Sequence, residues 1–267
     1  MITSRKNPLA QRAREARGGR ARDVLFVEGL RLCEEAARAG LAIEDVLFTE
    51  EFAAGARAAR LLSGLRQTGA RLSTVSEGVL ASVADTKTPQ GVVLLARRPA
   101  CDRESFERAV AGATPLVVVL HGANNPANAG AVARVAEAAG ASGLVATAGS
   151  TDLLSPKSLR ASAGSAFRLP LWAGAAFDEV IGWCKARGVE TFATDLAAGR
   201  SHTEVDWRGA RAVVIGAEAG GLSAGEAAAA DARVRIPMRA PVESLNLAVA
   251  AAVVLYEAAR QRGFDER

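Results

Sequence analysis

Residues 116–130 read LVVVLHGANNPANAG, which is an apolar run, a short polar loop and the start of a helix. The run Leu116–Leu120 has no polar alternation, which is typical of a strand buried on both faces of a parallel sheet. A helix is expected from Ala129 to Ala139, and a strand followed by a helix is half of a parallel crossover unit. This stretch therefore predicts an α/β domain with a parallel sheet.

The same alternation continues in both directions along the chain. Further strands are expected at 144–147, 190–194, 211–215 and 234–237, with helices near 177–187 and 243–260. Before residue 100, strands at 24–27, 46–48, 72–75 and 91–96 alternate with helices. The predicted organisation is a small α/β domain over 1–99, a linker over 100–114 with an amphipathic helix around 105–111, and the parallel-sheet domain over 115–267.

Positive charge is concentrated at the N-terminus of the 267-residue chain. The net charge is +4, and residues 1–25 hold seven arginines and lysines against two acidic residues. Such a basic segment on a near-neutral body favours contact with nucleic-acid phosphates, because arginine matches phosphate oxygens and counterion release adds affinity. The alternative is a solvated N-terminal helix.

Several classes of protein are excluded by composition. The longest strictly apolar run, Leu247–Tyr256, is too short for a bilayer, and the N-terminus does not resemble a signal peptide. Cys33, Cys101 and Cys184 are far apart, and the chain has two histidines, so no metal site is expected. A cytoplasmic protein with free thiols is the prediction.

Two more polar loops follow predicted strands of the second half. Residues 216–222 read GAEAGGL, and residues 235–249 contain RIPM followed by ESLNLAV. Ligands of open parallel sheets bind beyond the carboxyl ends of the strands, where these loops lie. The first loop fits an ordinary strand-to-helix turn with an Asn cap equally well, and Ser244 fits equally well as an ordinary helix cap. Residues 216–222 alone are a weak signal.

Together the three loops carry a more specific pattern. N-x-G-x-x-x-R from Asn128 to Arg134, G-x-E-x-x-G-L at 216–222, and I-P-M…E-S-L-N-x-A-V at 236–249 resemble the three motifs of the SpoU (TrmH) family. This family belongs to the SPOUT superfamily of RNA methyltransferases. More weakly, SRKNP at 4–8, FVEG at 26–29 and DTKTPQG at 85–91 resemble the family's N-terminal substrate-binding domain, an α/β fold similar to some ribosomal proteins.

The resemblance implies a ribose 2′-O-methyltransferase that uses S-adenosylmethionine. It also implies a deep trefoil knot in the parallel-sheet domain, an exception to the rule against threaded chains, and a homodimer formed through that domain. The residues that it assigns to cofactor binding on the knot loops are Thr194, Gly216, Ile236, Met238 and Leu245.

The family's catalytic positions correspond to five residues here. Arg134 would activate the ribose hydroxyl, but a guanidinium has a pKa above ~12, so we expect it to act as a cation that binds phosphate and stabilises the alkoxide. Asn128 would orient the nucleotide or Arg134, and Glu218 would hold a partner group. Ser244 and Asn246 would position the ribose and shape the cofactor loop; alternatively, Ser244 relays the proton.

RNA contacts are expected from two basic segments. The residues concerned are Arg5, Lys6 and Arg12 in the N-terminal segment, Lys157 and Arg160 in the small, polar stretch 154–165, and Arg134. The alternative for the second segment is a solvated helix.

The predicted substrate is structured RNA, with 23S ribosomal RNA favoured over transfer RNA. A non-catalytic RNA-binding relative is disfavoured because all five catalytic positions are filled. A NAD-dependent dehydrogenase is disfavoured because GxGxxG is absent, and a hydrolase because GxSxG is absent.

Overall fold

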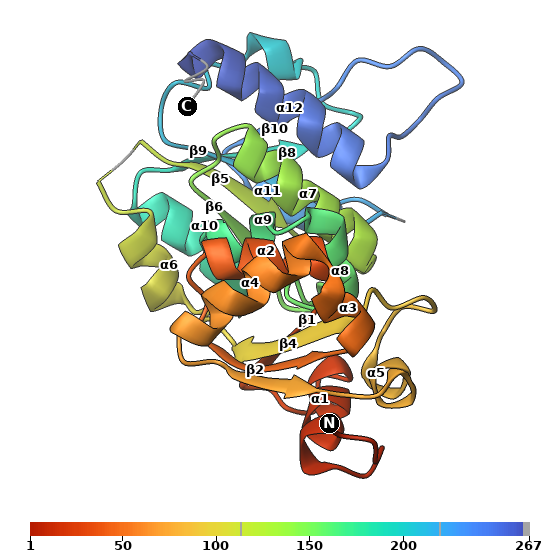
Figure 1. Ribbon diagram of the computed structural model, residues 1–267. Coiled ribbons are helices and arrows are strands. Elements are labelled where there is room, and N and C mark those ends of the chain that lie inside the picture. Colours follow the sequence, from red (N-terminus) through yellow and green to blue (C-terminus); the bar gives the residue numbers. More distant parts are fainter. Residues whose placement is uncertain (113, 219, 264–267) are drawn as a thin grey trace. The chain divides into compact units, whose positions relative to one another are not determined.

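The computed structural model describes residues 1–112, 114–218 and 220–263, and these residues form two compact units (Figure 1). The first unit comprises residues 1–100 and 154–167. The second comprises residues 101–153 and the chain from Arg168 onward. No helix among the described residues is long and apolar enough to cross a membrane.

A four-stranded sheet forms the centre of the first unit, in the order β1-β4-β2-β3. Its strands are β1 (Val24–Glu28), β2 (Ile43–Phe48), β3 (Arg71–Thr74) and β4 (Val92–Arg97). Strand β4 runs antiparallel to β1 and β2, whereas β2 and β3 are parallel. The helices of this unit are α1 (Pro8–Arg17), α2 (Leu30–Arg38), α3 (Glu50–Ala54), α4 (Ala56–Gln67), α5 (Glu77–Val83) and α8 (Pro156–Ser162).

The basic N-terminal segment is a packed helix rather than a free arm. Ala10, Ala13 and Ala16 lie on one face of α1 and are buried in a core with residues of α5 and the sheet. At the C-terminal end of the same face, Arg17 donates hydrogen bonds to the carbonyls of Val83 and Ala84 at the end of α5. Part of the positive charge of residues 1–25 is therefore used to hold α1 in place.

A six-stranded, wholly parallel sheet forms the second unit, in the order β10-β8-β9-β5-β6-β7. Its strands are β5 (Leu116–Leu120), β6 (Gly143–Thr147), β7 (Leu171–Ala175), β8 (Glu190–Thr194), β9 (Arg211–Ile215) and β10 (Ala232–Val234). Its helices are α6 (Arg103–Ala109), α7 (Pro126–Ala138), α10 (Phe177–Ala186), α11 (Ala224–Ala229) and α12 (Leu247–Arg262), with the 3-10 turn η1 (His202–Glu204). The short helix α9 (Ser165–Arg168) ends at the boundary between the two units. The predicted parallel sheet is confirmed.

Helices cover both faces of this sheet. Alternate residues of β5, Val117 and Val119, are buried in one core with residues of α6 and α10, and Phe106 of α6 packs against Trp172 and Trp183 there. Helices α7 and α12 pack against each other and contact β6 and β9. The segment expected to be a linker thus contains a helix that belongs to the core of the second unit.

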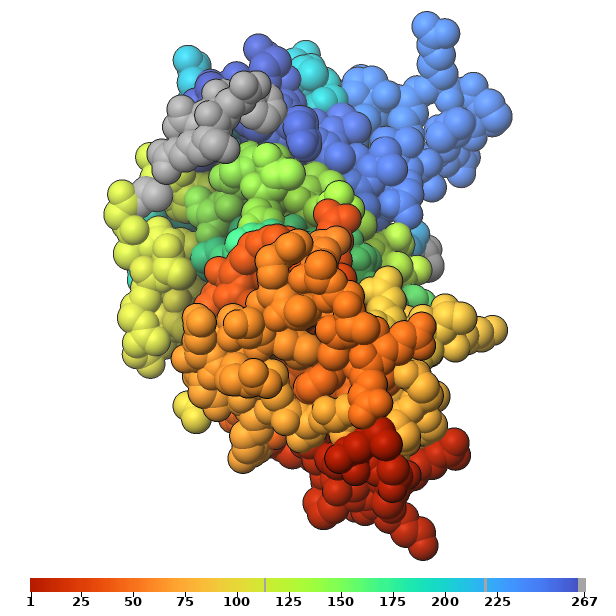
Figure 2. Space-filling view, in the orientation of Figure 1, coloured from red at the N-terminus to blue at the C-terminus, as the bar shows by residue number. Residues whose placement is uncertain are grey.

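The C-terminal helix begins later than the sequence predicts. Residues 239–246 form an exposed loop that contains a turn, in which the N–H of Val242 donates to the carbonyl of Arg239 at 3.1 Å. This segment projects from the second unit in Figures 1 and 2 before α12 starts at Leu247. The N-cap of α12 is Asn246, whose Oδ1 accepts hydrogen bonds from the backbone N–H groups of Ala248 and Val249. The alternative of Ser244 as the cap is therefore wrong.

Candidate active site

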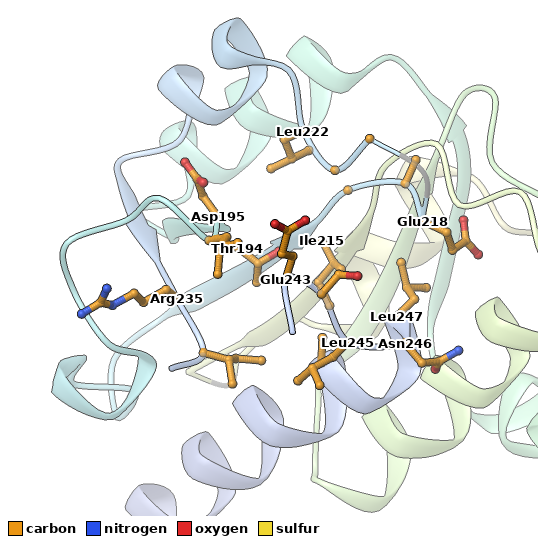
Figure 3. A pocket seen from close by; sticks show the side chains of 18 of the residues that line it. Thr194, Asp195, Ile215, Glu218, Leu222, Arg235, Glu243, Leu245, Asn246 and Leu247 are labelled. Atoms are coloured by element: carbon orange, nitrogen blue, oxygen red, sulfur yellow. The ribbon is translucent and has the colours of Figure 1, made fainter. Parts of the chain in front are cut away.

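A cavity of about 760 Å³ lies in the second unit where β8, β9 and β10 end (Figure 3). This volume is in the range of pockets that hold a cofactor-sized ligand. Its walls come from the loops after these strands, from the projecting segment before α12, and from Asn128 in the first turn of α7. Nine residues predicted for the site line it, and they are Asn128, Thr194, Gly216, Glu218, Ile236, Met238, Ser244, Leu245 and Asn246.

Three polar side chains from three motifs form one hydrogen-bonded chain at the edge of the cavity. Because Oδ1 of Asn246 caps α12, its Nδ2 points outward and donates to Oδ1 of Asn128 at 3.0 Å. Nδ2 of Asn128 is then available to donate to Oε1 of Glu218 at 3.1 Å. The helix cap thus determines which way each amide faces, and the chain ends on a carboxylate.

The ionisation of Glu218 follows from this arrangement. Burial acts to raise the pKa of its carboxyl group, but hydrogen bonds from Asn128 and from backbone N–H groups outweigh burial and lower the pKa below its usual range. Glu218 is therefore a carboxylate at neutral pH, suited to orienting donors such as Asn128.

The loop after β9 needs glycine at its first position. A Cβ at Gly216 would lie 2.3 Å from the carbonyl carbon of Gly221 and 2.5 Å from the backbone nitrogen of Leu222. The loop folds back on itself here, with the N–H of Gly221 donating to the carbonyl of Ala217 at 2.9 Å. Any side chain at position 216 would open this turn and move the cavity wall.

The remaining predicted cofactor residues contribute in different ways. Thr194 donates its hydroxyl to the carbonyl of Val214 at 3.1 Å, so that its side chain fastens β8 to β9 at the cavity. Ile236, Met238 and Leu245 provide apolar surface, and Ser244 is exposed in the projecting segment.

Arg134 is the predicted catalytic residue that the structure does not bring to the cavity. It is exposed on α7 and is not among the described residues that line this pocket. Six positions along a helix separate Arg134 from Asn128 by about 120° around the axis and about 9 Å along it. The two side chains therefore leave α7 on different faces.

The predicted RNA-binding residues of the first unit also differ in their surroundings. Arg12 is ion-paired with Glu44 at 2.5 Å and with Asp45 at 2.7 Å, which disfavours a phosphate contact. Arg160 pairs with Asp85 at 2.7 Å, and Arg5 donates to the carbonyl of Gly78. The charges with the most open surroundings are Lys6 and Lys157, which are both exposed.

Two acidic residues of the cavity were given no role by the sequence analysis, although Glu243 is part of the third motif. Asp195 directly follows β8 and pairs with Arg233 at 3.2 Å, and Glu243 lies in the segment before α12. Their position just after a parallel strand, or just before the last helix, was the available signal. Among residues 1–112, 114–218 and 220–263, no cluster of three potential metal ligands occurs.

The chemistry of the walls fits S-adenosylmethionine. Ile215, Leu222 and Leu247 offer apolar surface suited to a purine ring. Glu218 and Glu243 place negative charge at the same cavity, where it would favour a cationic sulfonium and ammonium. Figure 3 shows Glu218 and Asn246 at one end of the cavity and Arg235 at the other.

Comparison with known proteins agrees with this fold and site. Residues 115–256 match the SpoU rRNA Methylase family, and residues 26–100 match the RNA 2′-O ribose methyltransferase substrate-binding domain. An uncharacterized tRNA/rRNA methyltransferase of Synechocystis sp. is 33% identical over 98% of this chain and 94% of its own. The 23S rRNA (guanosine(2553)-2′-O)-methyltransferase RlmP of Bacillus subtilis is 29% identical over 88% of each chain.

A solved structure of a SpoU methyltransferase also matches this chain. The SpoU methyltransferase AviRb of Streptomyces viridochromogenes, in complex with the cofactor AdoMet, matches with a TM-score of 0.86 at 29% identity. The match covers 96% of this chain and 98% of that one.

Fold and cavity together define an α/β methyltransferase of the SPOUT type. The chain belongs to the SpoU family of RNA 2′-O-ribose methyltransferases, and its methyl donor is S-adenosylmethionine.

Proposed function

We propose that this enzyme methylates the ribose 2′-hydroxyl of a nucleotide in 23S ribosomal RNA. The observation that carries the proposal is the cavity bordered by the chain Asn246–Asn128–Glu218, which places three motif residues of an RNA methyltransferase around one pocket. RlmP of Bacillus subtilis, which acts on 23S rRNA by its name, supports the choice of target. Transfer RNA is the second candidate, because the Synechocystis relative is named for both RNAs.

The cofactor-binding role is assigned to residues that line the cavity. Thr194, Gly216, Ile236, Met238 and Leu245 would hold S-adenosylmethionine. When bound, this cofactor supplies an electrophilic methyl group on a positively charged sulfur. The two apolar side chains that follow β10, Ile236 and Met238, would exclude water from one side of it.

The residues around the ribose would align its hydroxyl and stabilise developing negative charge. Asn128 is held in one orientation by Asn246 and Glu218, and would present a fixed polar group to the nucleotide. Ser244 has an exposed hydroxyl in the projecting segment, where it would bind the ribose or accept and pass on its proton. Arg134 would supply the cation for the phosphate and the alkoxide.

In a homodimer formed through the second unit, Arg134 would reach the cavity of the partner chain. Because this side chain leaves α7 away from the cavity of its own chain, a second copy would bring it to the partner's site. Val249 and Tyr256 support such a contact, since they lie seven positions apart on α12 and are 49% and 45% exposed. A deep trefoil knot in the same unit stays part of this proposal.

The first unit would bind the RNA outside the methylated nucleotide. We assign this role to residues 1–99 as a substrate-binding domain, together with residues 154–167 of the same unit. Methyl transfer is assigned to the rest of residues 115–267, with 100–114 between the two. The exposed side chains of Lys6 and Lys157 are the favoured phosphate contacts, with Arg5 and Arg160 as further ones. Because its substrate would be ribosomal RNA, we place the enzyme in the cytoplasm.

The test is transfer of labelled methyl groups from S-adenosylmethionine to unmodified 23S ribosomal RNA and transfer RNA, followed by nucleoside analysis. A 2′-O-methylated nucleoside in 23S RNA supports the proposal, and one in transfer RNA alone replaces the target. If neither naked RNA is methylated, partly assembled large subunits are assayed, and inactivity on these as well would overturn the choice of 23S RNA.

A further inference from the structure

His121 lies directly after β5 and contacts three elements of the second unit. Its Nδ1 is 2.9 Å from Oγ1 of Thr147 on β6, and its Nε2 is 2.9 Å from Oε1 of Glu226 on α11. Its ring also packs on Phe177 of α10, with 4.6 Å between the ring centroids. The imidazole is largely enclosed, with 19% of its side chain exposed, and it does not line the cavity.

The hydrogen-bond partner of Nε2 shows that this atom of His121 carries a proton. A carboxylate accepts and does not donate, so Nε2 donates its proton to the carboxylate of Glu226. The hydroxyl of Thr147 either donates to Nδ1, or accepts from it while donating to the carbonyl of Leu120 at 3.3 Å. The bond to Glu226 is therefore present in both the neutral and the protonated imidazole.

The same residue fastens both ends of the loop that forms one wall of the cavity. At the start of the loop, the backbone N–H of His121 donates to the carbonyl of Ile215, the last residue of β9, at 2.9 Å. At the end of the loop, the side chain of His121 holds Glu226. Between them lie Gly216 and Leu222, which line the cavity.

Glu226 passes this restraint on to the loop itself. Its second oxygen, Oε2, accepts the backbone N–H of Ser223 at 2.7 Å, while Oγ of Ser223 accepts the N–H of Glu226 at 3.3 Å. These two bonds form a capping box at the start of α11. Because one carboxylate serves both His121 and Ser223, the last residue before α11 is fixed relative to β5.

We propose that His121 is a positioning residue for the cofactor, which sets affinity for S-adenosylmethionine by clamping the loop 216–223 without contacting the ligand. The inference rests on the proposed placement of the cofactor in this cavity. Hydrogen bonds that orient ligand-holding groups commonly change affinity tenfold or more when they are lost, because the binding geometry is then no longer prepared in advance.

Three variants separate the contacts of the imidazole. His121→Gln places an amide N–H near the position of Nε2 and keeps a donor for Glu226. His121→Asn keeps a polar group near Nδ1 alone, and His121→Phe keeps a ring for Phe177 but has no donor. Affinity for S-adenosylmethionine is measured by titration calorimetry, and turnover at saturating cofactor on the RNA that the wild type methylates.

The expected result is that His121→Asn and His121→Phe raise the Kd for S-adenosylmethionine about tenfold or more, whereas His121→Gln raises it by less than about threefold. Turnover at saturating cofactor should change less than about threefold in all three variants. Unchanged affinity in His121→Asn and His121→Phe would overturn the clamp. Equal losses of affinity in all three variants, together with a common fall in Tm, would also overturn it, because they would show a general packing role. A wild type that does not bind the cofactor at all would instead overturn the proposed cavity.

Discussion

Asn246 and Asn128 lie 118 positions apart in the sequence, and Nδ2 of the first donates to Oδ1 of the second at 3.0 Å. The bond joins the N-cap of α12 to the first turn of α7, and these two helices pack along each other. Because Asn246 caps α12, its amide has one orientation, which fixes the amide of Asn128 and directs Nδ2 of Asn128 to Glu218.

Asn128→Asp should reduce methyl transfer about a hundredfold while affinity for S-adenosylmethionine changes little. The new carboxylate cannot donate to Glu218, and two like charges would face each other across the former hydrogen bond. Single-turnover rates and cofactor titration measure the two effects. Asn128→Ser, which is uncharged, serves as the comparison, and equal activity of the Asp variant and the wild type would contradict the role of Asn128.

Arg134→Ala should lower turnover about 10²–10³-fold, the usual cost of losing one group that stabilises an oxyanion, while the Kd for S-adenosylmethionine stays within about threefold. Heterodimers of Arg134→Ala with Glu218→Ala should regain about half the wild-type activity. In such a pair, one cavity receives an intact Glu218 from its own chain and an intact Arg134 from the partner. Inactive heterodimers would show that Arg134 does not act across the dimer.

Gly216→Ala should weaken cofactor binding and destabilise the protein by roughly 1–3 kcal/mol, because the methyl group would overlap the backbone of Gly221. Gly225→Ala in α11 is the matched control, since a Cβ there meets no atom within 4 Å. Thermal unfolding and cofactor titration of both variants check this. If Gly216→Ala had the same Tm and the same Kd for S-adenosylmethionine as Gly225→Ala, the turn would open without loss of stability and the prediction would be wrong.

Lys6→Ala and Arg12→Ala should separate RNA contact from stability. Lys6 is exposed, so its loss should reduce the slope of log affinity against log salt by about 0.7–0.9 with little change in Tm. Arg12 shares the buried Asp45 with Arg71 and also pairs with Glu44, so its loss should lower Tm and leave the salt slope nearly unchanged. RNA binding at several salt concentrations measures the slope, and thermal unfolding measures Tm. If Arg12→Ala reduced the salt slope and left Tm unchanged, Arg12 would be an RNA contact as the sequence predicted.

Glu257→Gln should make the second unit less sensitive to acid. Hydrogen bonds from Arg260 and Gln261 lower the pKa of Glu257 to about 2 in the folded protein. Since this pKa is below its ordinary value of 4.5, the stabilising contribution is fully present above about pH 4.5 and is lost as the pH falls toward 2. The difference in Tm between wild type and variant should therefore shrink over this range, and a constant difference would contradict the interaction.

Much of the fold could be predicted because it is encoded by neighbours in the sequence. The strands 116–120, 190–194 and 211–215 appear at their predicted bounds. Each is a five-residue segment rich in β-branched, aromatic or other apolar residues, and this length favours a strand over a helix. The three motif loops also lie where expected, at the carboxyl ends of parallel strands. Those predictions needed little beyond hydrophobic pattern, turn residues and the family resemblance.

Other features depended on contacts between distant segments. The charge of residues 1–25 indicated an arm, but the structure shows that the alanines of α1 are buried and that Arg12 and Arg17 are paired within the first unit. The sequence shows which residues are charged but not which residues they pair with in the folded protein. Asp45 lies 33 positions from Arg12 in the sequence, and its carboxylate changes what this arginine is free to bind.

By itself, the sequence determined the parallel sheet, the family and the set of polar residues available for the chemistry. Tertiary structure alone decided which of these residues meet: Asn128, Glu218 and Asn246 are hydrogen-bonded, whereas Arg134 leaves the same helix as Asn128 on another face. It also showed that His121 fastens both ends of the loop 216–223. The physical reason is that burial patterns and caps arise from residues a few positions apart, while the geometry of a site depends on side chains brought together from strands and helices about a hundred residues apart.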